Sequence, residues 1–299
     1  MFFERRRRVV AFTLVSALLL LPAIAPAPAQ AQLEVLLTGD DGFDAPGLRA
    51  MRDALLAAGH RVTVVAPLDD RSGTGSSVTM SGMLDYYPQA EGVWAVDGTP
   101  SDAVTLALVH VMRASPPDLV ISGANLGHTV GADVIASGTA GAALTAARAG
   151  YPAIAVSVAA DAGEAGESPA FPSTTAAFAP AAALVVEIAR QLAETGGTGL
   201  LAPRTILNVN YPAVGSGEPA GVRFASVSSQ RAFRQLFSVA GASGPARVQS
   251  VPGDPARAEE GSDFALLMQG YVTISVLDGN LDAGEGSWEP LLQRLIIER

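Results

Sequence analysis

The amino-acid sequence predicts an α/β protein built around a mostly parallel sheet. Short apolar runs alternate with amphipathic segments, which is the pattern of successive βαβ units. Each predicted strand holds at least three consecutive apolar residues, as is typical of strands buried on both faces. Strands are expected at Leu33 to Thr38, Arg61 to Ala66, Asp118 to Ser122 and Ala153 to Val158, and helices at Pro46 to Ala58, Pro100 to Arg113 and Gly138 to Ala149.

The remaining segments predict a hairpin, a long helix and extended arms. Within residues 76–96, the alternating segments "MLDYY" and "VWAV" indicate an antiparallel hairpin. The Ala-, Gly-, Ser- and Pro-rich stretch at 161–175 is expected to be a loop before an Ala-rich helix at Phe178 to Glu194, which "GGTG" ends. "TILNVNYP" reads as a further strand, and 215–262 as extended arms and mobile loops. "FALLMQGYVTISVL" and a closing helix "WEPLLQRLI" complete the expected fold.

The first 31 residues have the pattern of a secretory signal peptide. A basic run at Arg5 to Arg8 precedes an apolar stretch at Val9 to Leu21 and the small-residue pattern Ala29-Gln30-Ala31. The apolar stretch is shorter than the roughly 20 residues that span a bilayer, so no stable membrane anchor is expected. We expect cleavage near Ala31 and a periplasmic or secreted protein, by a Sec or a twin-arginine route. Residues 32–299 are then one domain, with a core at about 32–212 and an arm and closing elements at about 213–299.

Composition excludes several classes of partner. Without its first 31 residues, the chain has 15 arginines, no lysine and 28 acidic residues, a net charge of −13. Such an acidic surface argues against binding to nucleic-acid polymers or to membrane surfaces, because both require a positive field. The chain has no cysteine, which rules out disulfides and thiolate zinc sites.

Polar residues that suit a cation follow three of the predicted strands. Asp40 and Asp41 follow the first, Ser72 the second and Asn125 the third. Because ligands of open α/β sheets bind at the carboxyl ends of the strands, we expect these loops to converge. Carboxylate, hydroxyl and amide oxygens are hard donors, which select Mg²⁺, Mn²⁺ or Ca²⁺ over zinc or copper.

A candidate anion site lies at the start of the third predicted helix. Ser137, Gly138 and Thr139 would present free N–H groups and hydroxyls to an anion. A cation beside an anion site indicates phosphate ester chemistry, in which the cation neutralises phosphoryl oxygens and activates a water. Two simpler readings stay open: adjacent acids before a glycine are common in turns, and Ser137 can act only as a helix cap.

Five ordered blocks, spread over about residues 33–277, resemble the SurE (survival protein E) nucleotidases. They are "LLTGDDGFDAPGLRAM", "VTVVAPLDDRSGTGSSVTM", "VDGTPSDAV", "PDLVISGANLGHTVGADVIASGTAGAA", and "ILNVNYP" with "GSDFALLMQGYVTIS". The resemblance implies a metal-dependent phosphomonoesterase that hydrolyses nucleoside monophosphates, as a 5′- or 3′-nucleotidase. It also implies a doubly wound sheet with a projecting C-terminal β-hairpin arm, which exchanges between subunits to give a homodimer or homotetramer.

The resemblance also assigns roles to residues of this chain. Mn²⁺ or Mg²⁺ would be held by Asp40, Asp41, Ser72 and Asn125, with the two aspartates as the catalytic residues. The phosphate-binding candidates are Gly39, Arg71, Ser137, Gly138 and Thr139. Arg71 has an equally strong alternative, which is an ion pair with Asp69 or Asp70.

The chain departs from the family pattern around this site. Gly39 and Thr129 stand where the family usually has asparagine, and Ala132 where it often has an acid. His128 is new in this loop and is expected to replace part of the missing polarity. His60 and His110 lie outside the three loops and are expected to be structural. The departures keep open an exported phosphoester-binding protein, or a weakened phosphatase with a non-nucleotide substrate. A purely structural module would leave the clustered oxygen donors unexplained.

Overall fold

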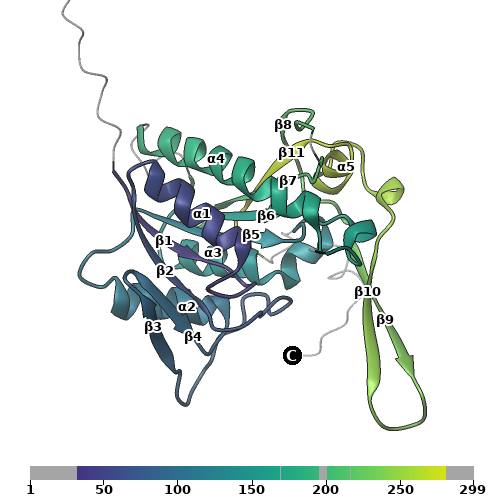
Figure 1. Cartoon of the computed structure of the whole chain (residues 1–299), viewed down its shortest axis with the longest axis horizontal. Coiled ribbons are helices and arrows are strands. Elements are labelled where there is room, and N and C mark those ends of the chain that lie inside the picture. Colours follow the sequence, from purple (N-terminus) through teal and green to yellow (C-terminus); the bar gives the residue numbers. More distant parts are fainter. Residues whose placement is uncertain (1–31, 169, 195–200, 216, 281–299) are drawn as a thin grey trace, which may run out of the picture. The chain divides into compact units, whose positions relative to one another are not determined.

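The computed structural model describes residues 32–168, 170–194, 201–215 and 217–280, and this part forms an α/β domain (Figure 1). The strands are β1 Glu34–Thr38, β2 Arg61–Pro67, β3 Tyr86–Ala90, β4 Val93–Val96, β5 Leu119–Leu126, β6 Ala153–Val158, β7 Ile206–Tyr211, β8 Val222–Phe224, β9 Phe233–Val239, β10 Ala246–Pro252 and β11 Val272–Leu277. The helices are α1 Pro46–Ala57, α2 Pro100–Leu106, α3 Gly138–Arg148, α4 Pro172–Glu194 and α5 Asp263–Met268. The predicted signal peptide, the "GGTG" segment and the closing helix "WEPLLQRLI" lie outside the described residues.

The main sheet is doubly wound around β1. Its strand order is β3-β4-β2-β1-β5-β6-β7-β11-β8, and the strands from β4 to β7 in this order run parallel to one another. The chain builds outward from β1 through β2 to β4, then crosses back to β5 and builds in the opposite direction. The switch point therefore lies between β1 and β5, where open sheets of this kind bind ligands. The predicted parallel, doubly wound fold is confirmed.

Two helical layers bury both faces of this sheet. On one face, α1 and α4 pack in a core that includes Val35, Leu37 and Phe178. On the other face, α2 and α3 pack over Leu36 and Val65. Successive residues of β1 point to opposite faces, so continuous apolar strands are required where both faces are covered.

Several elements differ in extent from the predicted ones. Helix α4 begins at Pro172, six residues earlier than expected, because Phe171 has a positive φ of 53° and proline suits a first helical position. The helix continues through Pro180, whose neighbours Phe178 and Ala181 are buried in the core. Strand β5 extends four residues beyond Ser122. The second predicted helix is observed as two consecutive elements, which are α2 and a π-helical turn at Ala107–Val111.

Helix α4 is long and apolar enough, by length and composition alone, to cross a membrane. Its buried apolar residues, including Val185 and Ala189, lie in the core shared with α1 and the sheet. These residues cover one face of the sheet.

The C-terminal region contains the projecting hairpin. Strands β9 and β10 form a separate antiparallel pair, which extends away from the main sheet in Figure 1. Apolar side chains on this arm are exposed, among them Leu236, Phe237, Val239 and Val248. Extended arms were expected in this region and are confirmed. The predicted hairpin at residues 76–96 is also confirmed as β3 and β4.

One glycine brings the first helix against the switch point. A Cβ on Gly47, at the start of α1, would lie 1.9 Å from the carbonyl oxygen of Ala124 and 2.7 Å from a ring carbon of Phe178. Only glycine permits this approach, which places the segment between β1 and α1 directly against the end of β5.

Candidate metal and phosphate site

Backbone hydrogen bonds bring the three predicted loops together at the switch point. The N–H of Arg71, after β2, donates to the carbonyl oxygen of Asp40 at 2.7 Å. The N–H of Leu126, in β5, donates to Oδ2 of Asp41 at 2.7 Å. The loop after β1 is therefore tied to both neighbouring strands, and the expected convergence of these loops is observed.

The amino end of α3 binds the first of the two carboxylates. Thr139 donates to Asp40 with its Oγ1, at 2.6 Å to Oδ1, and with its N–H, at 3.1 Å to Oδ2. A Cβ on Gly138 would lie 2.8 Å from Cβ and Oδ2 of Asp40, so this position requires glycine. Asp40 is only 3% exposed. Ser137 caps the helix, because its Oγ accepts from the N–H of Ala140 at 3.1 Å. Capping is compatible with anion binding, since both use the same helix end.

Burial disfavours the ionised forms of both carboxyl groups. It raises the pKa of Asp40 above its ordinary value, against the opposing effect of the Thr139 hydroxyl. It also raises the pKa of Asp41 to about 7; the Leu126 N–H opposes this rise, and the charges of Asp40 and Asp70 add to it. A divalent cation would reverse both effects, because an opposite charge within a few ångströms favours the ionised form. The electrostatics of this site therefore fit the predicted cation.

The two uncharged metal ligands predicted from the sequence, Asn125 and Ser72, lie in the segments that these hydrogen bonds connect. Asn125 donates its Nδ2 to the carbonyl oxygen of Gly127 at 2.6 Å, which orients the amide and leaves its oxygen as the acceptor end. Ser72 is held by its N–H, which donates to Oδ1 of Asp70 at 2.7 Å, and its hydroxyl is not needed for this contact. Among the described residues, no group of three or more His, Cys, Asp and Glu side chains is arranged to hold a metal. The predicted set is of another kind, with two acids and two neutral oxygen donors.

Arg71 has neither of the acidic partners considered from the sequence. Its Nη2 lies 2.8 Å from Oδ1 of Asp97, the residue after β4, so pairing with Asp69 or Asp70 was wrong. Residue separation explains the error, because Asp97 is 26 positions away in the chain and reaches Arg71 only through the β2–β4 pairing. The Nε of Arg71 is buried and has no hydrogen-bond partner within the described part of the chain.

Gly39 is not required by the backbone. Its φ lies outside the left-handed region, and an added Cβ would meet only the Cδ1 of Leu48 closely, at 3.3 Å. A flexible leucine end can move by a few tenths of an ångström. The backbone and its surroundings therefore accept a Cβ at this position, and neither the backbone conformation nor the space at the Cβ requires glycine.

Thr129 is the centre of a buried polar network that the sequence did not reveal. Its N–H donates to Oδ1 of Asn210 at 2.7 Å, and its carbonyl oxygen accepts from Nδ2 of Asn208 and of Asn210, both at 2.9 Å. Its hydroxyl accepts from Ser157 at 2.9 Å and contacts the hydroxyl of Ser137 at 3.2 Å. The available signal was the pair of asparagines two residues apart in "NVNYP", which share one face of an otherwise apolar strand.

His128 does not replace polarity at the acidic site, and this expectation was wrong. Its ring stacks on that of Phe233, with centroids 4.5 Å apart and planes 25° apart. Burial lowers the pKa of His128 to about 4, so the ring is neutral near pH 7; the charge of Asp133 opposes this shift. His128 contacts Phe233 of the C-terminal arm, about 100 positions away, and the sequence around His128 gives no signal of this contact.

The other two histidines and Ala132 lie outside the acidic site. His60 is buried and accepts from the N–H of Leu33 at 3.2 Å. His110 lies 2.8 Å from the hydroxyl of Tyr86. Ala132 is exposed, and its N–H donates to the carbonyl oxygen of Gln230 at 2.9 Å.

This fold and site define an α/β protein in which acidic, amide and helix-terminal groups lie at a topological switch point, the place where open α/β sheets bind ligands. Comparisons with known proteins identify the family. The model of the survival protein SurE family matches residues 35–234, so the chain belongs to the SurE family.

Individual relatives agree with this assignment. The chain is 33% identical over 273 residues to the 5′-nucleotidase SurE of Thermosynechococcus vestitus, covering 85% of this chain and 94% of that protein. It is 38% identical over 256 residues to the 5′-nucleotidase SurE of Nitratidesulfovibrio vulgaris, covering 81% and 86%. The crystal structure of the SurE protein from Aquifex aeolicus is similar, with a TM-score of 0.69 and 29% identity, covering 87% of this chain and 98% of that one.

The Thr129 network predicts a difference between two conservative substitutions. Thr129→Val deprives the buried hydroxyl of Ser157 of its partner, which is expected to lower the free energy of unfolding by about 1–3 kcal/mol. Thr129→Ser keeps the hydroxyl and loses a methyl group, at a cost of about 1 kcal/mol. Urea unfolding of both variants measures the difference. Equal stabilities would contradict the role of the hydroxyl.

The neutral His128 predicts a pH-dependent loss of stability. An unfolded histidine binds a proton below its ordinary pKa of 6.5, whereas the folded ring does so only near 4. The groups that face it are Asp133, paired with Arg231, and Asp161 in the adjoining cavity. Folding stability is therefore present above the unfolded pKa and lost as the pH falls through this interval. Between about pH 7 and pH 5 the wild type should lose about 2 kcal/mol more than His128→Phe.

Urea unfolding of the two proteins at both pH values checks this expectation. The comparison cancels the carboxylates that titrate in both. If His128→Phe loses as much stability as the wild type, the ring is not held neutral by burial.

Proposed function

We propose that this chain is a metal-dependent phosphomonoesterase, which hydrolyses nucleoside monophosphates to nucleosides and phosphate. The observation that carries this proposal is the contact between the buried Asp40 and the amino end of α3, beside Asp41. It places groups suited to a cation and groups suited to an anion at one point. The nucleotide substrate is supported by the 5′-nucleotidase names of the curated relatives.

The cation would be Mn²⁺ or Mg²⁺, held by Asp40, Asp41, Ser72 and Asn125. All four offer oxygen donors, as these ions prefer. Such an ion supplies neutralisation of the phosphoryl oxygens and a lowered pKa for a water, which makes a nucleophile available near neutral pH.

The chain's own groups bind and orient the phosphate. Gly138 and Thr139 open α3, where the positive end of the helix dipole favours an anion. Ser137 offers its hydroxyl from the same end, and the Thr129 contact fixes its position. Arg71 approaches from the loop after β2 with its unpartnered Nε.

Export and assembly are part of the same proposal. The pattern of residues 1–31 supports cleavage near Ala31 and a periplasmic or secreted enzyme. The arm formed by β9 and β10 carries exposed apolar side chains, which supports a homodimer or homotetramer in which the arm packs against another subunit.

A second candidate is a phosphoester-binding protein, or a weakened phosphatase with a non-nucleotide substrate. Gly39 favours it, because the position lacks the side chain that the family pattern places beside the acids. The frame of the site is otherwise complete, which favours the enzyme.

The proposed roles predict a loss of activity on removal of one carboxylate. Asp41→Asn should lower the manganese-dependent hydrolysis of adenosine 5′-monophosphate by about 100-fold or more, since even groups that support a metal ligand act on this scale. Asp53→Asn, an exposed change of the same kind in α1, is the matched control and should retain activity. Activity that persists in Asp41→Asn or in the presence of EDTA would refute the proposal.

The second candidate has its own test in Gly39→Asn. If turnover is limited by the missing side chain, this variant should hydrolyse nucleotides about 10-fold faster, since supporting groups at metal sites act on this scale. Steady-state kinetics of the two proteins give the comparison. Efficient hydrolysis by the wild type, with no gain in the variant, would exclude the weakened-enzyme reading.

A further inference from the structure

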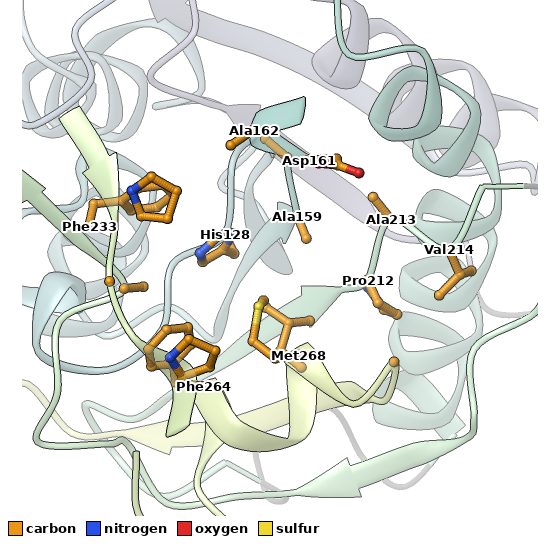
Figure 2. A pocket seen from close by; sticks show the side chains of 17 residues that line it. His128, Ala159, Asp161, Ala162, Pro212, Ala213, Val214, Phe233, Phe264 and Met268 are labelled. Carbon is orange, nitrogen blue, oxygen red and sulfur yellow. The ribbon is translucent and has the colours of Figure 1, made fainter. Parts of the chain in front are cut away.

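A cavity of about 410 Å³ lies between the main sheet, α5 and the base of the arm (Figure 2). Its walls are mainly apolar, and Figure 2 shows His128, Phe233, Phe264 and Met268 on one side with Pro212 and Val214 opposite. This volume falls in the range of about 300–1,000 Å³ that is usual for small-molecule sites.

The cavity lies on the same edge of the sheet as the acidic site. Ala159 directly follows β6 and Pro212 directly follows β7, so the cavity opens at the carboxyl ends of these strands. Neighbouring strands are about 4.8 Å apart. The cavity is therefore displaced by only one or two strands from the end of β5, where Asn125 lies.

One loop connects the cavity to the phosphate-binding groups. This loop follows Asn125 and Leu126 at the end of β5, ends at Ser137 and carries His128. The adjacent Thr129 touches the hydroxyl of Ser137. A ligand that occupies both places would thus be bound by a single loop.

The arm and α5 hold the aromatic wall against this loop. Asp133 accepts from the N–H of Phe233 and from Nε of Arg231, both at 2.8 Å. Asp263, which is buried, accepts from the N–H groups of Gly131 and Phe264. The cavity is consequently a built feature with fixed walls.

The chemistry of the cavity suits an uncharged planar ring. The ring of His128 lies 4.5 Å from that of Phe233 and 6.4 Å from that of Phe264, with interplanar angles of 25° and 17°. Its Nδ1 is buried and has no partner in the part of the chain that the structure describes, so a polar ring edge that reached it would satisfy an unpaired polar atom. Among the lining residues, all from the described part, there is no arginine or lysine, and Asp161 is acidic. A second phosphate would find no counter-charge here.

We propose that this cavity binds the base of a nucleoside monophosphate whose phosphate lies at the amino end of α3. His128 and Phe233 provide the stacking surface, and Nδ1 of His128 offers a hydrogen bond to the edge of the base. The inference rests on the proposed function and deepens it, because it makes the nucleoside, and not the phosphate alone, a recognised part of the substrate. Stacking of a base on an aromatic side chain contributes about 1–3 kcal/mol.

The kinetic test compares two phosphate esters that differ in the base. In His128→Ala, the ratio of kcat/KM for adenosine 5′-monophosphate to kcat/KM for ribose 5-phosphate should fall about 10-fold, as loss of one stacking contact predicts. His128→Phe keeps the stacking surface and should retain most of the ratio. His110→Ala, a histidine change outside the cavity, is the matched control. An unchanged ratio in His128→Ala would overturn the inference.

A binding test separates this inference from the proposed function. Adenosine carries no phosphate, and ligand-observed NMR should detect its binding to the wild-type protein and a marked weakening in His128→Ala. If adenosine binds in this way but no nucleotide is hydrolysed, the proposed function fails while the base site stands. If adenosine does not bind to the wild type, or binds equally to the variant, the base site is refuted even when nucleotides are hydrolysed.

Discussion

The candidate site is centred on two adjacent carboxyl groups at the end of a central strand, of which Asp40 is buried and Asp41 is half-buried. Asp40 and Asp41 carry like charges in a place where water is largely excluded, which raises the pKa of both. Hydrogen bonds from α3 and from β5 offset part of this cost, and a bound cation would offset the rest. The strand order serves this arrangement, because only a switch point between β1 and β5 brings these donors to one acidic pair.

Glycines allow the surrounding elements to approach that pair. Gly138 lets the amino end of α3 touch Asp40, and Gly47 lets α1 pack on the backbone of β5. In both places a methyl group would overlap atoms of the site. The motif at 36–47 therefore combines the acids with one of the glycines that make their burial feasible.

Sequence patterns predicted the elements whose signal is local. The run "AIAVSV" delimits β6 as observed, and the acids and the "SGT" segment could be assigned because they adjoin strand and helix ends. Contacts between distant positions were not predictable in this way. Thr129 is hydrogen-bonded to Asn208 and Asn210, which are 79 and 81 positions away. Arg71 forms an ion pair with Asp97 and not with the acids next to it in the sequence. The environment of His128 likewise depends on Phe233, which the arm supplies.

These contacts also explain how the chain departs from its family while keeping the frame of the site. Thr129, which replaces an asparagine, is integrated in a network of its own, and Ala132 is exposed. Gly39 removes a side chain that the packing would accept. The substitutions thus leave the acidic pair and its hydrogen bonds in place.

The central claim is that Asp40 and Asp41 form part of a site for a divalent cation. Calorimetric titration of Mn²⁺ into the metal-free protein tests it most directly, because it measures cation binding itself. The account predicts binding at one site in the wild type and its loss in the double variant Asp40→Asn/Asp41→Asn, whose fold is checked by circular dichroism. No binding by the wild type, or equal binding by the folded double variant, would contradict it.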